Sequence, residues 1–555
     1  MKYQITTILL ILTTFSFSQQ KKDFTQFVNP LIGTSKMGHV FPGATTPFGM
    51  VQLSPQTNYQ TMFLPDGNYN KETYEYCAGY QYKDSTIIGF SHTNFSGTGH
   101  ADLGDFLVMP TVGDLNLEPF KDKDGKKGFY STFSHQSEVA SPGYYKVDLD
   151  SYKIKAELTT SDRVGFHQYT FPKSNSAHII LDLVYNVYDY DDKNVWTFIR
   201  VENDSLITGY RQTRGWARTR TVYFAMQFSK PFKSYGHKKY DKAKYNGFYR
   251  RFNEYENFPE MAGNDIRAYF NFDTNNLETI KIKFALSSVS SAGALNNLNT
   301  EIPHWDFQKE LAETQQKWDN LLQRVEVEKE ASTEKKTMFY TGLYHTMLMP
   351  VDRTGENPLW TNDEPYYDDF YTIWDTFRTS SPLITLIDSK RKVDIINAML
   401  NIYKREGFLP EGRSGNDNGR TQGGSNAEVV LADAFVKNLK GIDYELALQA
   451  MQQALTAQQT LAEQRYDLSI AQSAAELGVL SREADLQQSR RRHDVAQLAA
   501  AAQQQRLWLA IGTTALILAI TLFFMLKIRR KNQALQQSLD HLQRTRKQLV
   551  EAEKM

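Results

Sequence analysis

The first half of the chain alternates apolar and polar residues in short runs, the pattern of half-buried β-strands. Gly, Asn, Asp and Ser, which favour turns, separate these runs. They include YYKVDLD, IKAELTT, RVGFHQYTF, HIILDLVYNV, TVYFAMQF and IKIKFALSSV. Many short strands with few helical patterns between them are typical of a sandwich. We therefore predict an N-terminal β-sandwich over residues 24–295.

From about Trp305 the apolar residues recur at helical spacing. The segments with this pattern are FQKELAETQQKWDNLLQRV, EKKTMFYTGLYHTMLM, SSPLITLIDSK, KVDIINAMLNIYKREG and AEVVLADAFVKNL. They predict antiparallel helices over residues 300–450. The fold class is thus α+β with several domains.

Composition changes abruptly near Ala450. Gln and Ala become abundant, and neither a Lys nor an Asn occurs between Lys440 and Lys527. We expect long exposed helices over residues 451–506. The break has no linker, which indicates that two different proteins are joined near Ala450.

Two apolar segments lie outside the predicted domains. Residues 1–18 contain Lys2, an apolar run and then small polar residues, as in a secretory signal peptide. Residues 507–526, LWLAIGTTALILAITLFFML, are uncharged and long enough as a helix to cross a bilayer. The basic run KIRRK follows at once, which predicts a cytoplasmic C-terminus. We expect an exported N-terminal region and a single inner-membrane helix.

Residues 527–555 contain leucines at 4-3-7 spacing, the seam of a coiled coil: Leu535, Leu539, Leu542 and Leu549. This predicts a cytoplasmic coiled coil and a homodimer formed through it. A solvated amphipathic helix is the alternative.

Charge and cysteine content exclude several classes of protein. Lys and Arg number 63, as do Asp and Glu, so the neutral chain gives no basis for a nucleic-acid partner. Cys77 is the single cysteine, which excludes an intrachain disulfide framework and a zinc site built from cysteines.

Three polar stretches carry candidate chemistry. GFSHTNFSGTGHADLGDFLVMP, residues 89–110, has converging oxygens and imidazoles that suit a metal or a sugar, or else a long self-bonded turn. In YYDDFYTIWDTFRTSSP, residues 366–382, an aromatic ring lies beside a carboxylate and a guanidinium, which suits carbohydrate. The alternative is that Asp375 caps a helix or pairs with Arg378.

The third stretch is the long Gly- and Asn-rich loop over residues 407–437, and loops of this length are often functional. Glu411, Asp417 and Glu428 are its candidate acid–base groups. Helix capping explains the segment from Ser425 to Glu428 equally well.

Four motifs resemble glycoside hydrolase family 92 over about residues 24–450. They are VNPLIGTSKMGHVFPGATTPFGMVQLSPQT, GYQYKDSTIIGFSHTNFSGTGHADLGDFLVMP, IWDTFRTSSPL and GRSGNDNGRTQGGSNAEVVLADAFVK. The resemblance implies an exported, calcium-dependent α-mannosidase that inverts the anomeric centre and trims N-glycans or mannans, as in the Bacteroidota. It also implies that the helices after the sandwich form an (α/α)6 barrel, here incomplete because the match stops near residue 450.

The resemblance also carries residue roles. The WDTFR match implies substrate contacts for Trp374, Asp375 and Arg378, and the loop match implies them for His92, Asn94 and His100. The family's catalytic carboxylates and calcium ligands lie downstream of ADAFVK. We therefore expect no catalytic or metal-binding residue here, and an inactive enzyme that still binds a mannose-containing glycan.

The tail resembles a different family. LAEQRYDLSIAQSAAELGVLSREADLQQSRRRHDVAQLAAAA and LQRTRKQLVEAEKM resemble the membrane-flanking helices of bacterial sensor histidine kinases. The alternative function is therefore a membrane-anchored glycan-binding sensor that signals through a coiled coil.

Overall fold

The computed structural model describes residues 23–120, 125–238, 259–361, 363–419, 426–479 and 483–552. The chain divides into two compact units, Met1–Ala454 and Leu455–Met555. Their boundary lies close to the composition break near Ala450. The predicted signal peptide, residues 1–18, lies outside the described residues.

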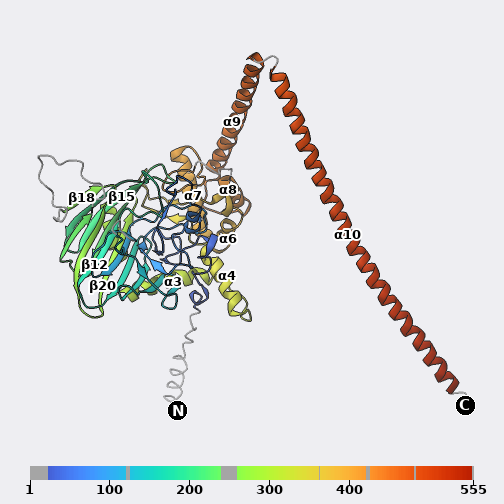
Figure 1. The fold of residues 1–555 in the computed structure, drawn as a ribbon, viewed down its shortest axis with the longest axis horizontal. Coiled ribbons are helices and arrows are strands. Elements are labelled where there is room, and N and C mark those ends of the chain that lie inside the picture. The colour runs from blue at the N-terminus through green and yellow to red at the C-terminus, as the bar shows by residue number, and fades with distance from the viewer. Residues whose placement is uncertain are drawn as a thin grey trace, which may run out of the picture. The chain divides into compact units, whose positions relative to one another are not determined.

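Two antiparallel sheets make up the N-terminal part of the first unit, so the predicted sandwich is confirmed (Figure 1). The seven-stranded sheet has the order β1 (Ala44–Thr45), β2 (Gln52–Gln56), β5 (Gly89–Ser91), β6 (Leu107–Val112), β12 (Ser174–Asp182), β19 (Arg267–Thr274) and β17 (Ser234–Lys238). The nine-stranded sheet has the order β18 (Glu260–Gly263), β14 (Asn194–Asn203), β15 (Leu206–Thr213), β16 (Arg220–Phe228), β20 (Glu278–Ser287), β11 (Val164–Phe171), β10 (Ile154–Thr160), β9 (Tyr144–Leu149) and β8 (Val139–Ser141).

Strand β11 shows how the sequence alternation builds both faces of the larger sheet. Tyr169 and Phe171 point into the core between the sheets. Val164 and Phe166 point to the other face, where helices α2 (Ser291–Glu301) and α3 (Phe307–Leu322) cover them. Side chains alternate faces along a strand, so one strand serves two apolar layers.

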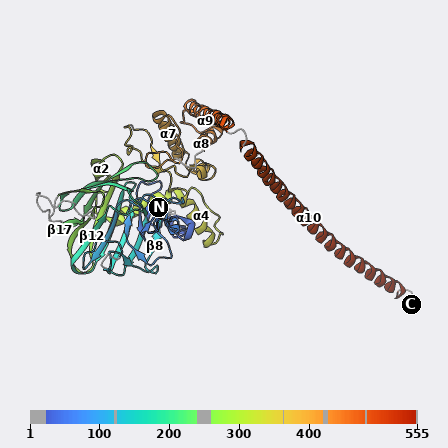
Figure 2. The same ribbon diagram turned by 45° about the horizontal axis from the view of Figure 1, so that its top comes forward.

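The C-terminal part of the first unit is helical, as predicted, and lies to one side of the sandwich (Figures 1 and 2). Its further helices are α4 (Thr333–His345), α5 (Ile373–Thr376), α6 (Ser380–Ile387), α7 (Ser389–Glu406), α8 (Asn426–Val436) and the start of α9 (Tyr444–Val479). One apolar cluster joins them, from Trp318 on α3 through Tyr344 and Ile396 to Val430 and Ala450. Closure into an (α/α)6 barrel stays a prediction.

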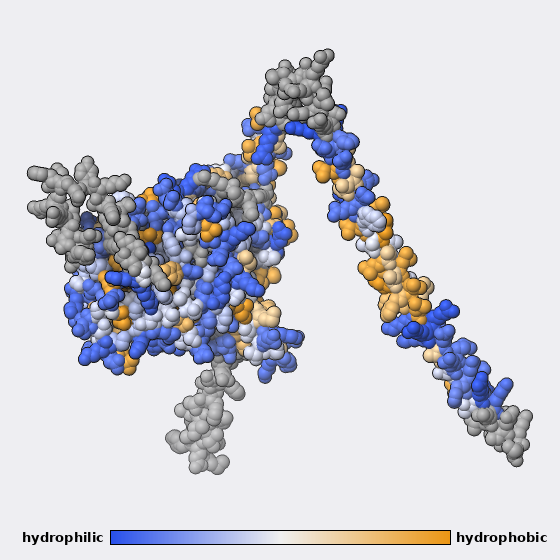
Figure 3. Space-filling model, in the orientation of Figure 1, coloured by the Kyte–Doolittle hydropathy of each residue, from blue (hydrophilic) through white to orange (hydrophobic). Residues whose placement is uncertain are grey.

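The second unit holds the rest of α9 and the long helix α10 (Glu483–Ala552). Within α10, residues 491–547 form the one described helix that is long and apolar enough to cross a membrane. Figure 3 shows an apolar band in the middle of α10 followed by a polar stretch. Both the span at residues 507–526 and the coiled-coil homodimer stay predictions.

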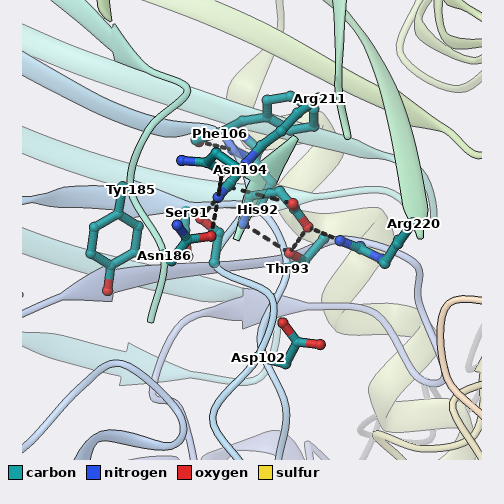
Figure 4. A network of polar contacts seen from close by, with 12 residues as sticks. Ser91, His92, Thr93, Asp102, Phe106, Tyr185, Asn186, Asn194, Arg211 and Arg220 are labelled. Atoms are coloured by element: carbon teal, nitrogen blue, oxygen red, sulfur yellow. Dashed lines mark hydrogen bonds and ion pairs between the residues drawn. The ribbon is translucent and has the colours of Figure 1, made fainter. Parts of the chain in front are cut away.

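Buried charges fix the loop between β5 and β6, which contains the first predicted site (Figure 4). Asp105 lies 2.5 Å from the Arg220 guanidinium and 3.6 Å from that of Arg211, and all three residues are buried. Asp102 lies 2.8 Å from the ammonium of Lys193, which is also buried. Because a charge removed from water is stable only when it is paired, the loop is tied to the ends of β14, β15 and β16.

The Asp102–Lys193 pair generates a prediction about stability and pH. Burial alone would raise the pKa of Asp102, but Lys193 and a backbone N–H outweigh it and hold that pKa well below its usual range. A carboxylate whose pKa is lowered on folding stabilises the protein above its unfolded pKa of about 3.9 and loses this effect as pH falls below it. Asp102→Asn should therefore cost about 3–5 kcal/mol of unfolding free energy at pH 7, and less at pH 3.5.

Urea denaturation followed by tryptophan fluorescence at both pH values measures this difference. The control is Asp273→Asn, which breaks an exposed pair with Lys233 and should cost less than about 1 kcal/mol. An equal cost for both substitutions at pH 7 would contradict the structural role of Asp102.

Candidate functional site

A cavity of about 600 Å³ opens where the sandwich meets the loops of the helical part. Its volume falls in the range of small-molecule sites. Its wall combines aromatic rings with charged groups of both signs: His100, Tyr190, Asp191, Asp192, Arg214, Gly215, Trp216, Ala217, Arg218 and Gly419. Rings that pack on the C–H face of a sugar, beside charged groups that bind hydroxyls, are a combination suited to carbohydrate.

Trp216 is the central residue of this wall, in the loop between β15 and β16. Its backbone N–H donates to Asp102 Oδ2 over 2.8 Å, and its indole N–H donates to the carbonyl of Gly412. The His100 ring meets the Trp216 ring edge-on at 4.8 Å between centroids. The sandwich thus holds the backbone of Trp216, and the helical part holds its ring.

The loop after α7 closes on Trp216 from the helical side. Gly412 has φ of +50°, and an added Cβ there would lie 2.7 Å from the Trp374 ring, so both the backbone angle and the space favour glycine. Trp374 stacks on Trp216 with 6.1 Å between centroids and 22° between planes. Asp417 accepts a hydrogen bond of 2.9 Å from the backbone N–H of Arg218. These contacts join the second and third polar stretches of the sequence at one place.

The structure places His92 and Asn94 inside the sandwich. His92 is fully buried, stacks on Phe284 at 3.9 Å and donates from Nδ1 to the carbonyl of Phe106 over 2.7 Å. Its Nε2 is then an acceptor, which receives the Nε2 proton of His167 over 2.9 Å. Burial lowers the pKa of His92 to about 3, so the ring is neutral.

The side-chain amide of Asn94, like the ring of His92, is engaged in hydrogen bonds inside the sandwich. Its amide N–H₂ donates to the carbonyl of Gln52 over 2.9 Å, and its carbonyl accepts from the amide of Gln56 over 2.8 Å. A sugar hydroxyl can reach a side chain only where that side chain is exposed. We therefore assign His92 and Asn94 to the support of the loop rather than to the cavity.

The other predicted site residues lie nearer the surface. His100 lines the cavity, and Trp374 backs it through its stacking on Trp216. Asp375 and Arg378 are exposed at α5 and just beyond it, and Arg378 lies over the Phe377 ring at 4.7 Å. Among the described ion pairs none joins Asp375 to Arg378, which was the alternative to a role in ligand binding. Their contact with a ligand stays a prediction.

Sequence reasoning missed most of the cavity wall. Trp216, Arg214 and Arg218 belong to TRGWARTR, and Asp191 and Asp192 to YDYDDKN. Neither segment stands out as a polar stretch in the sequence, because both are short and lie between predicted strands. An isolated tryptophan in an Arg- and Gly-rich turn was the available signal, because such a ring has no sheet face to pack on.

The candidate acid–base groups of the third stretch differ in environment. Asp417 is bonded to Arg218, as described above. Glu428, in the first turn of α8, is half-buried, and burial raises its pKa, with a further contribution from Glu411. The residues between Gly419 and Asn426 lie outside the described part of the chain.

Calcium, which the sequence resemblance implied, prefers six to eight oxygen ligands. In the described ranges, one group of three His, Cys, Asp or Glu side chains has its ligand atoms within 4.8 Å of one another: His304, Glu310 and Glu313. It contains an imidazole and lies outside the cavity wall, so it does not fit calcium. We assign no calcium ligand.

Two domain models of one family match nearly the whole first unit and beyond. The glycosyl hydrolase family 92 N-terminal domain matches residues 27–287, and the glycosyl hydrolase family 92 catalytic domain matches residues 293–502. A protein of Arthroderma benhamiae described as an uncharacterized secreted glycosidase is 28% identical over an alignment of 483 residues that covers 81% of this chain and 54% of that protein.

Solved structures agree with this match. A family GH92 alpha-mannosidase of Bacteroides thetaiotaomicron, in complex with mannoimidazole, is 35% identical with a TM-score of 0.69, over 78% of this chain and 55% of that one. A family GH92 inverting mannosidase of the same organism is 27% identical with a TM-score of 0.64, over 77% and 55%. The chain spans about half the length of these relatives.

The catalytic-domain match corrects one prediction from the sequence. We expected the resemblance to stop near Ala450 and the enzyme to be inactive because its catalytic carboxylates lay beyond a truncation. The match instead runs through the composition break to residue 502, so this prediction is wrong. The resemblance of the tail to sensor kinases stays a prediction.

The two domain matches cover residues 27–287 and 293–502. They therefore agree with a fold in which a sandwich is followed by a helical part, with the cavity between the two. The chain belongs to glycosyl hydrolase family 92.

Proposed function

We propose that this protein is an exo-acting α-mannosidase that removes mannose from N-glycans or mannans with inversion of the anomeric centre. The cavity around Trp216 is the observation that carries the proposal, because it presents an aromatic ring and charged hydrogen-bonding groups together. Family membership and the mannosidase structures among its relatives support the choice of sugar.

The wall of the cavity suggests how a sugar would be held. Trp216 is half-buried and lines the cavity, and its indole bond to Gly412 and its stacking on Trp374 hold the ring in place. Arg214 and Arg218, in the same turn as Trp216, are exposed. Asp191 and Asp192, in the turn that precedes β14, are exposed as well. Guanidinium groups donate hydrogen bonds and carboxylates accept them. A sugar hydroxyl can therefore accept from an arginine or donate to an aspartate of the wall.

Inversion constrains the chemistry further. One carboxylic acid protonates the leaving oxygen, while a second carboxylate, about 6.5–9.5 Å away, activates a water on the opposite face of the sugar. The product is then the β-anomer from an α-mannoside. Calcium dependence is part of the same proposal, on the strength of the family resemblance.

The full chain, incubated with an α-linked mannoside, should release β-mannose first, as observed by proton NMR before mutarotation. Trp216→Ala removes the ring from the wall and should lower kcat/KM by about 10- to 100-fold, since ring packing contributes about 1.5–3 kcal/mol. The control, Trp196→Ala, removes an exposed ring on β14 and should leave kcat/KM unchanged.

Three results would contradict the proposal: no release of mannose, α-mannose as the first product, or equal effects of the two substitutions. A chelator should stop turnover, and re-added calcium should restore it. Turnover that continues in the chelator would reject calcium dependence while leaving the mannosidase activity in place.

We further propose that residues 507–526 anchor the protein in a membrane. Every described side chain of this segment is exposed, the segment contains no charged residue, and the face of α10 seen in Figure 3 carries an apolar band. A helix of this kind is stable in a hydrocarbon layer, whose thickness it matches. The basic residues after it would then lie on the cytoplasmic side.

Replacing Ile517 and Leu518 with Arg should move the chain from the carbonate-resistant membrane fraction to the soluble fraction. Each Arg at the centre of a span costs about 2.5–3.5 kcal/mol of insertion free energy. The matched control is Leu539→Arg, on the same helix but beyond the apolar run. A wild-type chain that carbonate extracts completely would contradict the anchor.

A further inference from the structure

A cluster of three metal-ligand side chains lies where the connection after α2 enters α3. His304 belongs to the connection, Glu310 to the first turn of α3 and Glu313 to the turn after it. Glu310 and Glu313 are three residues apart, so they share one face of the helix. This place is on the outer face of the nine-stranded sheet, where Phe307 packs beside Phe166.

Among the described ion pairs Glu310 has one partner, His304 Nε2, at 3.9 Å, which is beyond hydrogen-bond distance. Glu310 is 3% exposed, and its Oε2 has no hydrogen-bond partner among the residues that the structure describes. A buried carboxylate oxygen without a hydrogen bond destabilises the folded protein, because it has lost its hydrogen bonds to water and forms none in the protein. The unpaired oxygen is the observation that distinguishes this cluster from exposed acidic groups.

The basic side chains nearest to this cluster form ion pairs with other carboxylates. Lys317, which lies near Glu310, is 2.8 Å from Asp162, and Arg163 is 2.7 Å from Glu301. Glu301 and Asp162 bring further negative charge to the same region. Lys309 lies 3.8 Å from the exposed Glu313, but among the described ion pairs no lysine or arginine reaches Glu310.

The spacing of the ligand atoms suits a small dication. His304 Nε2 and Glu310 Oε2 are 3.9 Å apart, and all three ligand atoms lie within 4.8 Å of one another. Tetrahedral ligands at 2.0–2.2 Å from zinc are about 3.3–3.6 Å apart. Closing the site thus needs a movement of a few tenths of an ångström by His304 and about 1 Å by Glu313, whose side chain is 53% exposed.

We propose that His304, Glu310 and Glu313 bind a zinc-class transition-metal dication, with water in the fourth position. An imidazole with two carboxylates is a ligand set for zinc, whereas calcium and magnesium favour oxygen alone. The two carboxylates balance the charge of the ion, so the bound site is neutral.

The ordinary alternative is a hydrogen bond from His304 to Glu310. The backbone N–H of Asp306 donates to His304 Nδ1 over 3.3 Å, which leaves the proton of the neutral ring on Nε2. At 3.9 Å, however, that proton is too far from Glu310 to satisfy it. Metal binding moves the proton to Nδ1 and gives up only the long bond from Asp306.

The ion would act as a structural clamp at the start of α3. That helix packs on the sheet through Phe307 and reaches the sandwich again through Trp318, whose indole N–H donates to the carbonyl of Thr45 over 2.7 Å. Fixing its first turns would thus fix the connection between the sandwich and the helices that follow.

Titration of the metal-free full chain with Co²⁺, followed by visible absorption, tests the proposal. We expect one equivalent to bind with the intense bands of a four-coordinate ion, and Zn²⁺ to displace it. Glu310→Gln and Glu313→Gln should each weaken binding at least tenfold. Glu334→Gln, an exposed residue in the first turn of α4, is the matched control and should bind as the wild type does.

Because Glu313 is half-exposed, its substitution keeps the test valid if Glu310→Gln destabilises the fold. Binding of Zn²⁺ should also raise the melting temperature of the wild type and of Glu334→Gln, but not that of Glu313→Gln. The proposal is overturned if the wild type binds no stoichiometric Co²⁺, or if Glu313→Gln binds as tightly as the control.

Discussion

The pairing of buried charge beneath the cavity is the constraint on which the site depends. Asp102 and Asp105 lie in the loop between β5 and β6, and each is paired with a buried cation of the nine-stranded sheet or of the turn that precedes β14. An unpaired charge at this depth would cost several kcal/mol, so alternative positions of the loop are excluded. The position of Trp216 follows, because its backbone N–H is bonded to Asp102.

The sequence predicted the fold well because periodicity reports directly on burial. The runs read as strands became β9, β10, β11, β12, β16 and β20, and the runs read as helices became α3, α4, α6, α7 and α8. A period of two or of 3.6 is enforced by every residue of an element, so single exceptions do not hide it. Turns carry no such repetition.

The site was predicted only in part, for the same physical reason. Polar residues in a Gly-rich loop serve either a ligand or the loop itself, and the sequence does not distinguish these uses. His92 and Asn94 hold the loop, whereas His100 from the same stretch lines the cavity. Trp216 comes from a distant turn, and its place beside Trp374 depends on packing between two parts of the fold. The composition break near Ala450 was predicted to end the family resemblance, but the catalytic-domain match runs through it to residue 502.

Trp216 is bonded at its backbone by the sandwich and at its indole by the helical part. Neither half, produced separately, would reproduce the wall of the cavity, since each supplies one of the two attachments. Any transplant of sugar recognition from this protein to another scaffold must therefore move both halves as a single piece. Because of this double attachment, a rotation of the sandwich relative to the helical part would change the environment of the Trp216 indole.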